Sequence, residues 1–474
     1  MKPLSIQEIK RAVGGKALSA IPATVPPLTG VCTDTRRMEP GRLFIALKGD
    51  NFDGHNYLPD AAKGGAIAAL VEHTPPEPRP NVHLIQVKNT RRAMGKLATH
   101  VRKQMRAKVI AVAGSNGKTS TKHLIDAALC GKMRGSISPK SYNNDIGVPL
   151  AIFPADPFQD YVVLEIGTNH HGEVKHLSDM ALPDIAVITN IGAEHLEGLT
   201  DIDGVRREEA SIIQGLNPRG CLIVNGDDGP LLQHVAQYRG QKITFGLKPT
   251  NDLFATDIHC GTDGVRFNLN GNNRSRVFVP MLGMHTACNA LAAIAVGRKM
   301  GLEVEAIIDS LSRAHGPDMR LQLSKVNGVT VLNDAYNANP NSTRAAIETL
   351  IALPNPRGRR VAVLGDMLEL GVHSDHYHEE TGALAAASNL DLLVCVGKKA
   401  QLIAESAKAS AKASGNGGPT IVTYPDAAAA ARGFIRRVRG GDLILLKGSR
   451  SIGLEAVAKA ITERDRKFNR KAAS

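Results

Sequence analysis

The sequence has no tryptophan, and only 4% of its 474 residues are aromatic. Aromatic platforms on which the bases of single-stranded nucleic acid could stack would therefore be hard to build. No apolar run reaches the ~18–20 residues that a membrane-spanning helix needs, and the first ten residues lack the apolar core of a signal peptide. We therefore expect no nucleic-acid partner, no membrane span and a cytoplasmic protein.

Cysteine pairs with the spacing of a metal or redox site are also absent. The six cysteines are scattered without a C-x-x-C pair, which argues for reduced thiols over a disulfide framework or a zinc site. Two histidine clusters could suggest zinc, but neither has a completing set of cysteines or carboxylates at zinc-ligand spacing. They are His170, His171 and His176, and His373, His376 and His378. We expect no zinc site.

Acidic residues are in deficit, 45 against 58 basic ones, which gives a net charge of +13. Nucleic-acid binding is one interpretation of this excess. An equally good one is an enzyme whose substrates are nucleotides and other anions, since a positive cleft concentrates them. The scarcity of aromatic residues favours the enzyme.

The length predicts about three domains of ordinary size, which we place at residues 1–106, 107–316 and 317–474. The first mixes short strands and helices, whereas short apolar runs alternate with helical stretches in the other two, as is typical of parallel sheets. In the third domain these runs are residues 329–332, 361–364, 392–396, 421–423 and 443–446. We predict an α/β protein with a mixed α/β first domain, a parallel-sheet second domain and a Rossmann-like third domain. Ligands are expected at the carboxyl ends of the strands.

The most informative stretch is residues 108–120, Lys-Val-Ile-Ala-Val-Ala-Gly-Ser-Asn-Gly-Lys-Thr-Ser. A strand-like run leads into a turn whose N–H groups can bind a phosphate at the start of a helix. Lys118 can supply a point charge and Thr119 a hydroxyl for Mg²⁺. Val112 occupies the place of the first glycine of the usual phosphate-loop pattern. The stretch predicts ATP or GTP binding, and the alternative is a tight turn with an accidental Gly-Lys pair. The phosphate-binding residues would be Gly114, Ser115, Asn116, Gly117, Lys118, Thr119 and Ser120.

Polar side chains follow two other apolar runs of the second domain. Glu165 ends the run 161–164, and a carboxylate beside a phosphate loop is well placed for Mg²⁺. The alternative is a surface glutamate that leads into a turn. His195 follows the run 185–189 and could be a metal ligand, a phosphate contact or a helix-capping histidine.

With further motifs, these residues resemble the Mur ligases of peptidoglycan synthesis, and the resemblance runs nearly end to end. The motifs outside the phosphate loop are residues 33–36, 41–49, 53–55, 143–149, 333–340, 364–371 and 447–450. The last three point to the branch that adds D-Ala-D-Ala. The resemblance implies a UDP-substrate domain, a central ATPase domain and a mobile C-terminal domain. It also implies that ATP and two Mg²⁺ ions serve to join D-Ala-D-Ala to UDP-MurNAc-tripeptide through an acyl phosphate. We also expect a monomer.

Roles can be carried over from the family position by position. Lys118 would bind the β- and γ-phosphates, and Arg320 the γ-phosphate from the C-terminal domain. Thr119 and Glu165 would hold one Mg²⁺ and His195 the second. The expected adenine and ribose contacts are Asn289 and Asp334. The expected substrate-binding residues are Thr33, Asp34, Thr35, Arg36, Asn143, Asn144, Asn337 and Asn339.

The sequence departs from the family at two places. Most Mur ligases have a lysine, carbamylated by CO₂, where the ungapped register here places Glu209. We hypothesise that Glu209 replaces that modified lysine as a catalytic carboxylate at the second metal and that activity is independent of CO₂. The alternative is a register shift that leaves Glu208 in the role, or no group at all. Asp318-Met-Arg320 also lacks the glycine that often precedes the arginine, which leaves the hinge conformation open.

Three other functions fit the sequence less well. A neighbouring amide ligase that adds a diamino acid or a polyglutamate tail is disfavoured by the motifs at 333–340 and 364–371. A P-loop NTPase that acts as a switch or a nucleic-acid motor leaves the first and third domains unexplained. A non-catalytic binding module does not fit a phosphate loop together with a candidate metal carboxylate.

Overall fold

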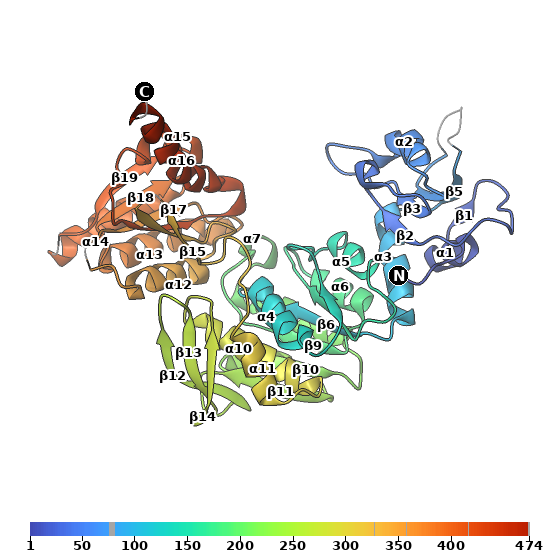
Figure 1. Ribbon diagram of the computed structural model, residues 1–474, viewed down its shortest axis with the longest axis horizontal. Coiled ribbons are helices and arrows are strands. Elements are labelled where there is room, and N and C mark those ends of the chain that lie inside the picture. Colours follow the sequence, from blue (N-terminus) through green and yellow to red (C-terminus); the bar gives the residue numbers. More distant parts are fainter. Residues whose placement is uncertain (75–80, 327, 357, 416, 473–474) are drawn as a thin grey trace.

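Three β-sheets, formed by successive segments of the chain, make up the framework of the protein (Figure 1). The computed structural model describes residues 1–74, 81–326, 328–356, 358–415 and 417–472. Figure 1 shows the middle body between the N-terminal and C-terminal ones. None of the helices in the described part is long and apolar enough to cross a membrane. The predicted α/β class is confirmed, with a mixed first sheet and largely parallel sheets after it.

The N-terminal body is a five-stranded sheet in the order β1-β5-β4-β3-β2, parallel except for β1 at one edge. Its strands are β1 (Lys16–Ala17), β2 (Gly30–Cys32), β3 (Arg42–Ile45), β4 (Ala68–Val71) and β5 (His83–Gln86). Its helices are α1 (Ile6–Val13), α2 (Leu58–Lys63) and α3 (Thr90–Gln104). Helix α3 also packs against the middle body, where Arg102 forms a 2.7 Å ion pair with Asp184. The two bodies share one hydrophobic core along this helix.

The middle body has nine strands in the order β14-β13-β12-β11-β10-β9-β6-β8-β7. The seven strands β6 to β12 run parallel to one another. Strands β13 and β14 add an antiparallel edge. The strands are β6 (Lys108–Ala113), β7 (Gly135–Ile137), β8 (Tyr161–Glu165), β9 (Ile185–Ile188), β10 (Cys221–Asn225), β11 (Gln241–Gly246), β12 (Leu253–Cys260), β13 (Val265–Leu269) and β14 (Asn272–Val279). The helices are α4 (Lys118–Cys130), α5 (Gly147–Ile152), α6 (Glu173–Ala181), α7 (Leu196–Leu199), α8 (Ile202–Ala210), α9 (Gly229–His234), α10 (His285–Lys299) and α11 (Val304–Leu311).

Strand β6 is apolar on both faces because helices cover both sides of the sheet. Val109, Ala111 and Ala113 belong to one hydrophobic core, and Ile110 and Val112 belong to the core on the opposite face. A central parallel strand therefore has a continuous apolar run and no polar–apolar alternation. This explains why residue 112 can be a valine: its side chain is fully buried within strand β6, two residues before Gly114, where the loop begins.

The C-terminal body is a six-stranded sheet in the order β15-β16-β20-β17-β18-β19, in which β15 alone is antiparallel. The strands are β15 (Gln322–Val326), β16 (Val329–Asn333), β17 (Arg360–Gly365), β18 (Leu392–Val396), β19 (Thr420–Tyr424) and β20 (Leu443–Lys447). The helices are α12 (Pro340–Ala352), α13 (Ser374–Ala387), α14 (Ala400–Ser414), α15 (Ala427–Phe434) and α16 (Glu455–Ala472). All five apolar runs predicted here are strands. The carboxyl ends of β16 and β20 carry polar side chains toward the middle body.

Candidate active site

A cavity of about 660 Å³ lies between the middle and C-terminal bodies. It is lined by the phosphate loop, by the segments that follow β8 and β9, and by the segment that follows β16. A second cavity of about 290 Å³ adjoins it, since both are lined by Asn116, Gly117, Arg320 and Ser342. The two cavities together form one cleft around the predicted phosphate loop.

The phosphate loop is held in one backbone conformation by its glycines and by the strand beside it. Gly114 and Gly117 have φ values of +113° and +81°, in the left-handed region that favours glycine. A side chain at Gly114 would lie 2.3 Å from the Thr189 hydroxyl, so the position has no room for one. The backbone N–H of Ser115 donates to the Asn190 carbonyl at 2.8 Å. Helix α4 begins directly after Gly117, and its N-terminus therefore faces the cleft, as anion binding requires.

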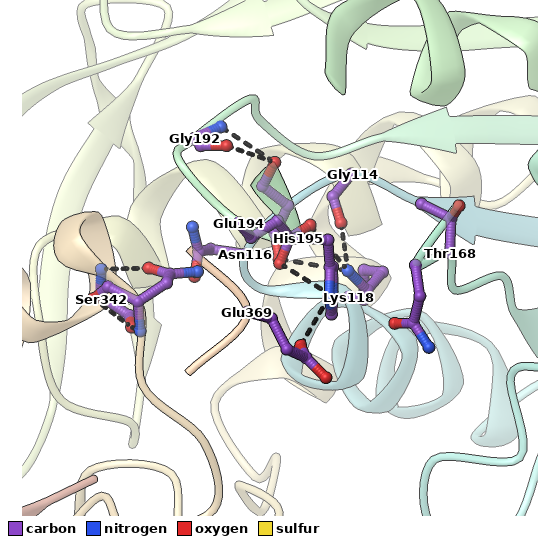
Figure 2. Close-up of polar contacts among 12 residues, drawn as sticks. Gly114, Asn116, Lys118, Thr168, Gly192, Glu194, His195, Ser342 and Glu369 are labelled. Atoms are coloured by element: carbon purple, nitrogen blue, oxygen red, sulfur yellow. Dashed lines mark hydrogen bonds and ion pairs between the residues drawn. The ribbon is translucent and has the colours of Figure 1, made fainter. Parts of the chain in front are cut away.

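Lys118 lies at the centre of the cleft, among oxygen atoms. Its Nζ donates to the carbonyls of Gly114 and Ser115 at 2.5 and 3.1 Å and lies 3.4 Å from the Glu194 carboxylate (Figure 2). Burial lowers the pKa of Lys118, but the nearby carboxylates of Glu194, Glu209 and Glu165 outweigh burial and raise it. The ammonium is therefore a permanent positive charge at physiological pH.

Glu165 is the carboxylate closest to the first turn of α4. Its Oε2 accepts a hydrogen bond from the Thr119 hydroxyl at 2.9 Å, and its Oε1 accepts one from the Asn143 amide at 3.0 Å. Lys122, one turn further along α4, places its ammonium 3.2 Å from the same carboxylate. A hydroxyl and a carboxylate in contact at the end of a phosphate loop are oxygen ligands of the kind that Mg²⁺ prefers.

Glu209 and Glu208 have separate environments. Glu209 is fully buried; its Oε2 accepts the Gly114 N–H at 2.7 Å, and its Oε1 has no hydrogen-bond partner among the described residues. Burial raises the pKa of Glu209 to about 7, against the opposing influence of Lys118. Glu208 instead accepts the N–H groups of Gly172 and Val174 at the start of α6, at 2.7 Å each. Glu209, and not Glu208, therefore faces the phosphate loop with an oxygen to offer.

His195 is at the first position before α7, with its ring at the wall of the cleft. Its Nδ1 lies 2.7 Å from the Glu369 carboxylate of the C-terminal body, and its Nε2 lies 3.9 Å from Glu194 (Figure 2). Burial lowers the pKa of His195, but Glu369 and Glu194 outweigh it and raise the pKa. His195, Glu165, Glu209 and Thr119 all offer ligand atoms near the loop, which suits Mg²⁺. Among the described residues no three His, Cys, Asp or Glu side chains form a metal cluster on their own, so bound Mg²⁺ would also need phosphate oxygens and water, as is usual.

The C-terminal body closes the cleft with Arg320, Tyr336 and two asparagines. The Arg320 guanidinium lies 4.2 Å from the centre of the Tyr336 ring, and its Nη2 is 3.5 Å from the Thr119 hydroxyl. The Tyr336 hydroxyl donates to Ser141 of the middle body at 2.6 Å. The Asn339 amide donates to Asn116 of the phosphate loop at 2.8 Å, and Asn337 lines the same cavity.

The backbone on either side of Arg320 shows how the chain dispenses with a glycine before this arginine. Met319 and Leu321, on either side of Arg320, have φ values of +56° and +48°. Met319 thus adopts the left-handed conformation itself. This answers the question that the Asp318-Met-Arg320 sequence left open.

The second cavity contains the two residues expected at adenine and ribose, together with Ser120 of the loop. The side-chain nitrogen of Asn289 is buried there without a hydrogen-bond partner among the described residues. Asp334 pairs with Lys447 at 2.6 Å and accepts the Leu321 N–H at 3.1 Å. The cavity thus offers an amide donor and a buried carboxylate next to the phosphate loop.

One predicted group lies outside this cleft. Thr33, Asp34, Thr35 and Arg36 are in the N-terminal body, where Asp34 caps a short 3₁₀ helix (Thr35–Arg37) and binds the Arg36 side chain at 2.8 Å. Asn143 and Asn144 do line the cleft, and the Asn144 side chain accepts the Gly147 N–H at 2.8 Å. The structure therefore gathers Thr119, Glu165 and His195 with the predicted nucleotide and C-terminal residues around one cleft. Glu209 is fully buried against Gly114 and does not line the cleft, and residues 33–36 lie apart.

The residues that the sequence did not predict include Glu194 and Tyr336, which line the cleft, and Lys122 and Glu369, which pair with Glu165 and His195 at its edge. Tyr336 and Glu369 lie inside motifs at 333–340 and 364–371 that carried the family resemblance, so a signal for them existed. Glu194 directly precedes His195. Lys122 had no signal, since a lysine on a helix is ordinarily exposed.

Comparison with known proteins assigns a family to all three bodies. Models described as "Mur ligase family, catalytic domain", "Mur ligase middle domain" and "Mur ligase, glutamate ligase domain" match residues 27–102, 112–297 and 319–450. The UDP-N-acetylmuramoyl-tripeptide–D-alanyl-D-alanine ligase of Bacillus subtilis is 38% identical over 92% of this chain and 93% of its own length. The Escherichia coli enzyme of the same name is 36% identical over 92% of this chain and 94% of its own.

Solved structures resemble the whole chain as well. A crystal structure of MurF from Acinetobacter baumannii superposes with a TM-score of 0.87 at 30% identity, covering 98% of this chain and 99% of that one. MurF ligase from Thermotoga maritima in complex with ADP superposes with a TM-score of 0.80 at 26% identity, covering 93% and 98%.

Proposed function

This chain belongs to the Mur ligase family, and we infer that it is an ATP-dependent ligase that joins D-Ala-D-Ala to UDP-MurNAc-tripeptide. The observation that carries this inference is the meeting of two distant segments in one cleft. The phosphate loop and Arg320 come from different bodies, yet the Arg320 guanidinium lies 3.5 Å from the Thr119 hydroxyl. The relatives that carry this enzyme name match the chain over nearly its whole length.

The reaction brings two anions together before any bond forms. The free carboxylate of the tripeptide attacks the γ-phosphate of ATP, which releases ADP and leaves an acyl phosphate. The amine of D-Ala-D-Ala then attacks the activated carbonyl, and phosphate leaves from the tetrahedral intermediate. Lys118 and Arg320 reduce the repulsion between the anions, and such preorganised charges are each worth a few kcal/mol, on the order of 3, in a closed site.

Closure of the cleft protects the acyl phosphate from water. Tyr336 and Asn339 support this role because their hydrogen bonds to Ser141 and Asn116 join the two bodies on either side of the phosphate loop. Asn143, Asn144 and Asn337 line the remainder of the cavity, and we assign them to the peptide and dipeptide substrates.

We further propose that Thr119 and Glu165 hold one Mg²⁺ and that His195 and Glu209 hold a second. When bound, Mg²⁺ neutralises phosphate charge and orients the phosphoryl group. Glu209 supports this assignment through its buried, unpartnered Oε1 beside the loop. Because a glutamate already carries a carboxylate, activity should be the same in CO₂-free and bicarbonate-containing buffer. Glu209→Ala should lose activity, and full activity of that variant would refute the role.

Several features stay predictions under this proposal. The N-terminal body, with Thr33, Asp34, Thr35 and Arg36, would bind the UDP-sugar. The boundaries at 106/107 and 316/317, the monomeric state and the cytoplasmic location are expectations of the same kind. Sedimentation at several concentrations would check the monomer.

The first experiment is phosphate release from ATP with Mg²⁺ and UDP-MurNAc-tripeptide, with and without D-Ala-D-Ala, and detection of the pentapeptide product by mass. We expect sustained release that requires both substrates. A Lys118→Met variant controls for contaminating ATPase. Release that is indifferent to the dipeptide, or no release, would refute the proposed substrate and direct the search to other amine acceptors.

A further inference from the structure

The ion pair between His195 and Glu369 joins the middle and C-terminal bodies at the wall of the cleft (Figure 2). Both residues have left-handed backbones, with φ values of +51° for His195 and +64° for Glu369. Such a conformation is unfavourable for residues other than glycine and persists only where the surrounding structure imposes it. Because two such residues face one another across the interface, the surrounding structure holds both of them in place for this contact.

The segment that carries Glu369 is rigidly fixed on both sides. Within its own body, the Met367 N–H donates to the ring of buried His378 at 3.0 Å. Across the interface, the Glu369 carbonyl accepts the Glu197 N–H at 3.1 Å. Met367 and Leu370 are buried in one apolar cluster with residues of the middle body, including Leu196. The Glu369 carboxylate therefore reaches His195 only when the two bodies are docked.

Stability alone does not explain this ion pair. The Glu369 side chain is 53% exposed, and ion pairs at such exposure contribute little to folding. The geometry has a different consequence, because it places the Glu369 carboxylate 2.7 Å from Nδ1, an atom with no aligned hydrogen bond to any described residue, and leaves Nε2 on the side of Glu194 and Lys118. A histidine that binds a metal through one nitrogen commonly donates its other N–H to a carboxylate, which fixes the ring orientation and the tautomer.

We propose that Glu369 is a positioning residue that orients the His195 ring for metal binding, so that the second Mg²⁺ site is completed only by docking of the C-terminal body. The proposal rests on the proposed function, since it takes His195 as a metal ligand. It adds that the orientation of the His195 ring is set by a carboxylate of the C-terminal body. Metal affinity and domain closure would thereby be coupled through one side chain.

Binding of Mn²⁺ to the full chain with ADP, followed by electron paramagnetic resonance, tests the proposal without depending on turnover. Glu369→Ala should weaken the second Mn²⁺ site by about 10- to 100-fold, as removal of such carboxylates does. Glu369→Gln keeps an acceptor oxygen and should weaken it less. In a His195→Ala background, Glu369→Ala should have no further effect.

His373→Ala is the matched control. It removes another contact of the same interface, 3.2 Å from His373 Nε2 to the Thr200 carbonyl, without touching His195. It should leave Mn²⁺ binding unchanged. Wild-type affinity in Glu369→Ala, or equal weakening in Glu369→Ala and His373→Ala, would overturn the proposal. Failure of the proposed function would be distinct, since wild-type protein would then make no pentapeptide.

Discussion

Replacement of Lys122 by methionine tests whether a buried cation supports the carboxylate next to the phosphate loop. The Lys122 side chain is fully buried, and its ammonium is surrounded by oxygen acceptors, among them the Ser138 hydroxyl at 3.3 Å. The others are the Ser138 carbonyl at 2.9 Å, the Lys140 carbonyl at 2.5 Å and the Glu165 carboxylate at 3.2 Å. Methionine has a similar length, so the change removes the charge and leaves little space unfilled.

The expected loss follows from the groups left without a partner. Breaking a buried ion pair by removing one member costs about 3–5 kcal/mol, since the remaining charge stays buried. Glu165 keeps its hydrogen bonds from Thr119 and Asn143, which limits the loss, whereas the two carbonyls lose a charged donor. We therefore expect the local free energy of opening to fall by about 4 kcal/mol. That corresponds to an increase of roughly 1,000-fold in amide exchange.

Hydrogen exchange of α4 and β8 is the suitable assay, because a chain with three bodies does not unfold in two states. Lys108→Met is the matched control, since Lys108 is 59% exposed and pairs with Asp184 at 3.4 Å. Its loss should stay below about 1 kcal/mol. Equal exchange in the two variants, or a loss below about 1 kcal/mol for Lys122→Met, would refute the claim that the ammonium stabilises this site.

Three further predictions concern the cleft and its support. Arg320→Lys keeps the charge but not the planar contact with Tyr336, so kcat for phosphate release should fall about 100-fold with little change in the KM for the tripeptide. Asn289→Ala should raise the KM for ATP about tenfold, the effect of one lost hydrogen bond, with kcat largely retained. Burial lowers the pKa of His378, with Asp366, Asp375 and Lys399 as the charged groups around it. The folded state then keeps the ring neutral while the unfolded state binds a proton below about pH 6.5, so thermal stability should decrease as pH falls through that value, by up to about 1.4 kcal/mol per pH unit. His378→Gln should flatten this dependence.

The sequence allowed the sheets and the phosphate loop to be predicted, because both depend on short-range patterns. Residues 109–113 and 161–164 are apolar at every position, as is typical of a parallel strand that is covered on both faces. The loop at 114–117 needs glycine for its backbone angles, and this need is visible in the chain itself. Glu165 and His195 could be predicted for a similar reason, since parallel strands bring their carboxyl ends to one edge of a sheet.

The residues that were missed depend on contacts between distant segments. Lys122 is buried because the segment at 138–140 folds over α4, and nothing in residues 118–130 indicates that cover. Glu369 matters because it meets His195, which is 174 residues away in the sequence. The choice between Glu208 and Glu209 was likewise open, because adjacent residues of α8 differ only in what their side chains meet.

Met319 has a consequence for how often the enzyme can turn over. A left-handed conformation costs a residue other than glycine about 1–2 kcal/mol, and Met319 lies in the connection between the middle and C-terminal bodies. The docked arrangement therefore stores strain that any opened arrangement with a relaxed residue 319 would release. Product departure would be accelerated by the same connection that positions Arg320. The identity of residue 319 would then contribute to the balance between holding a reactive intermediate and releasing the finished product.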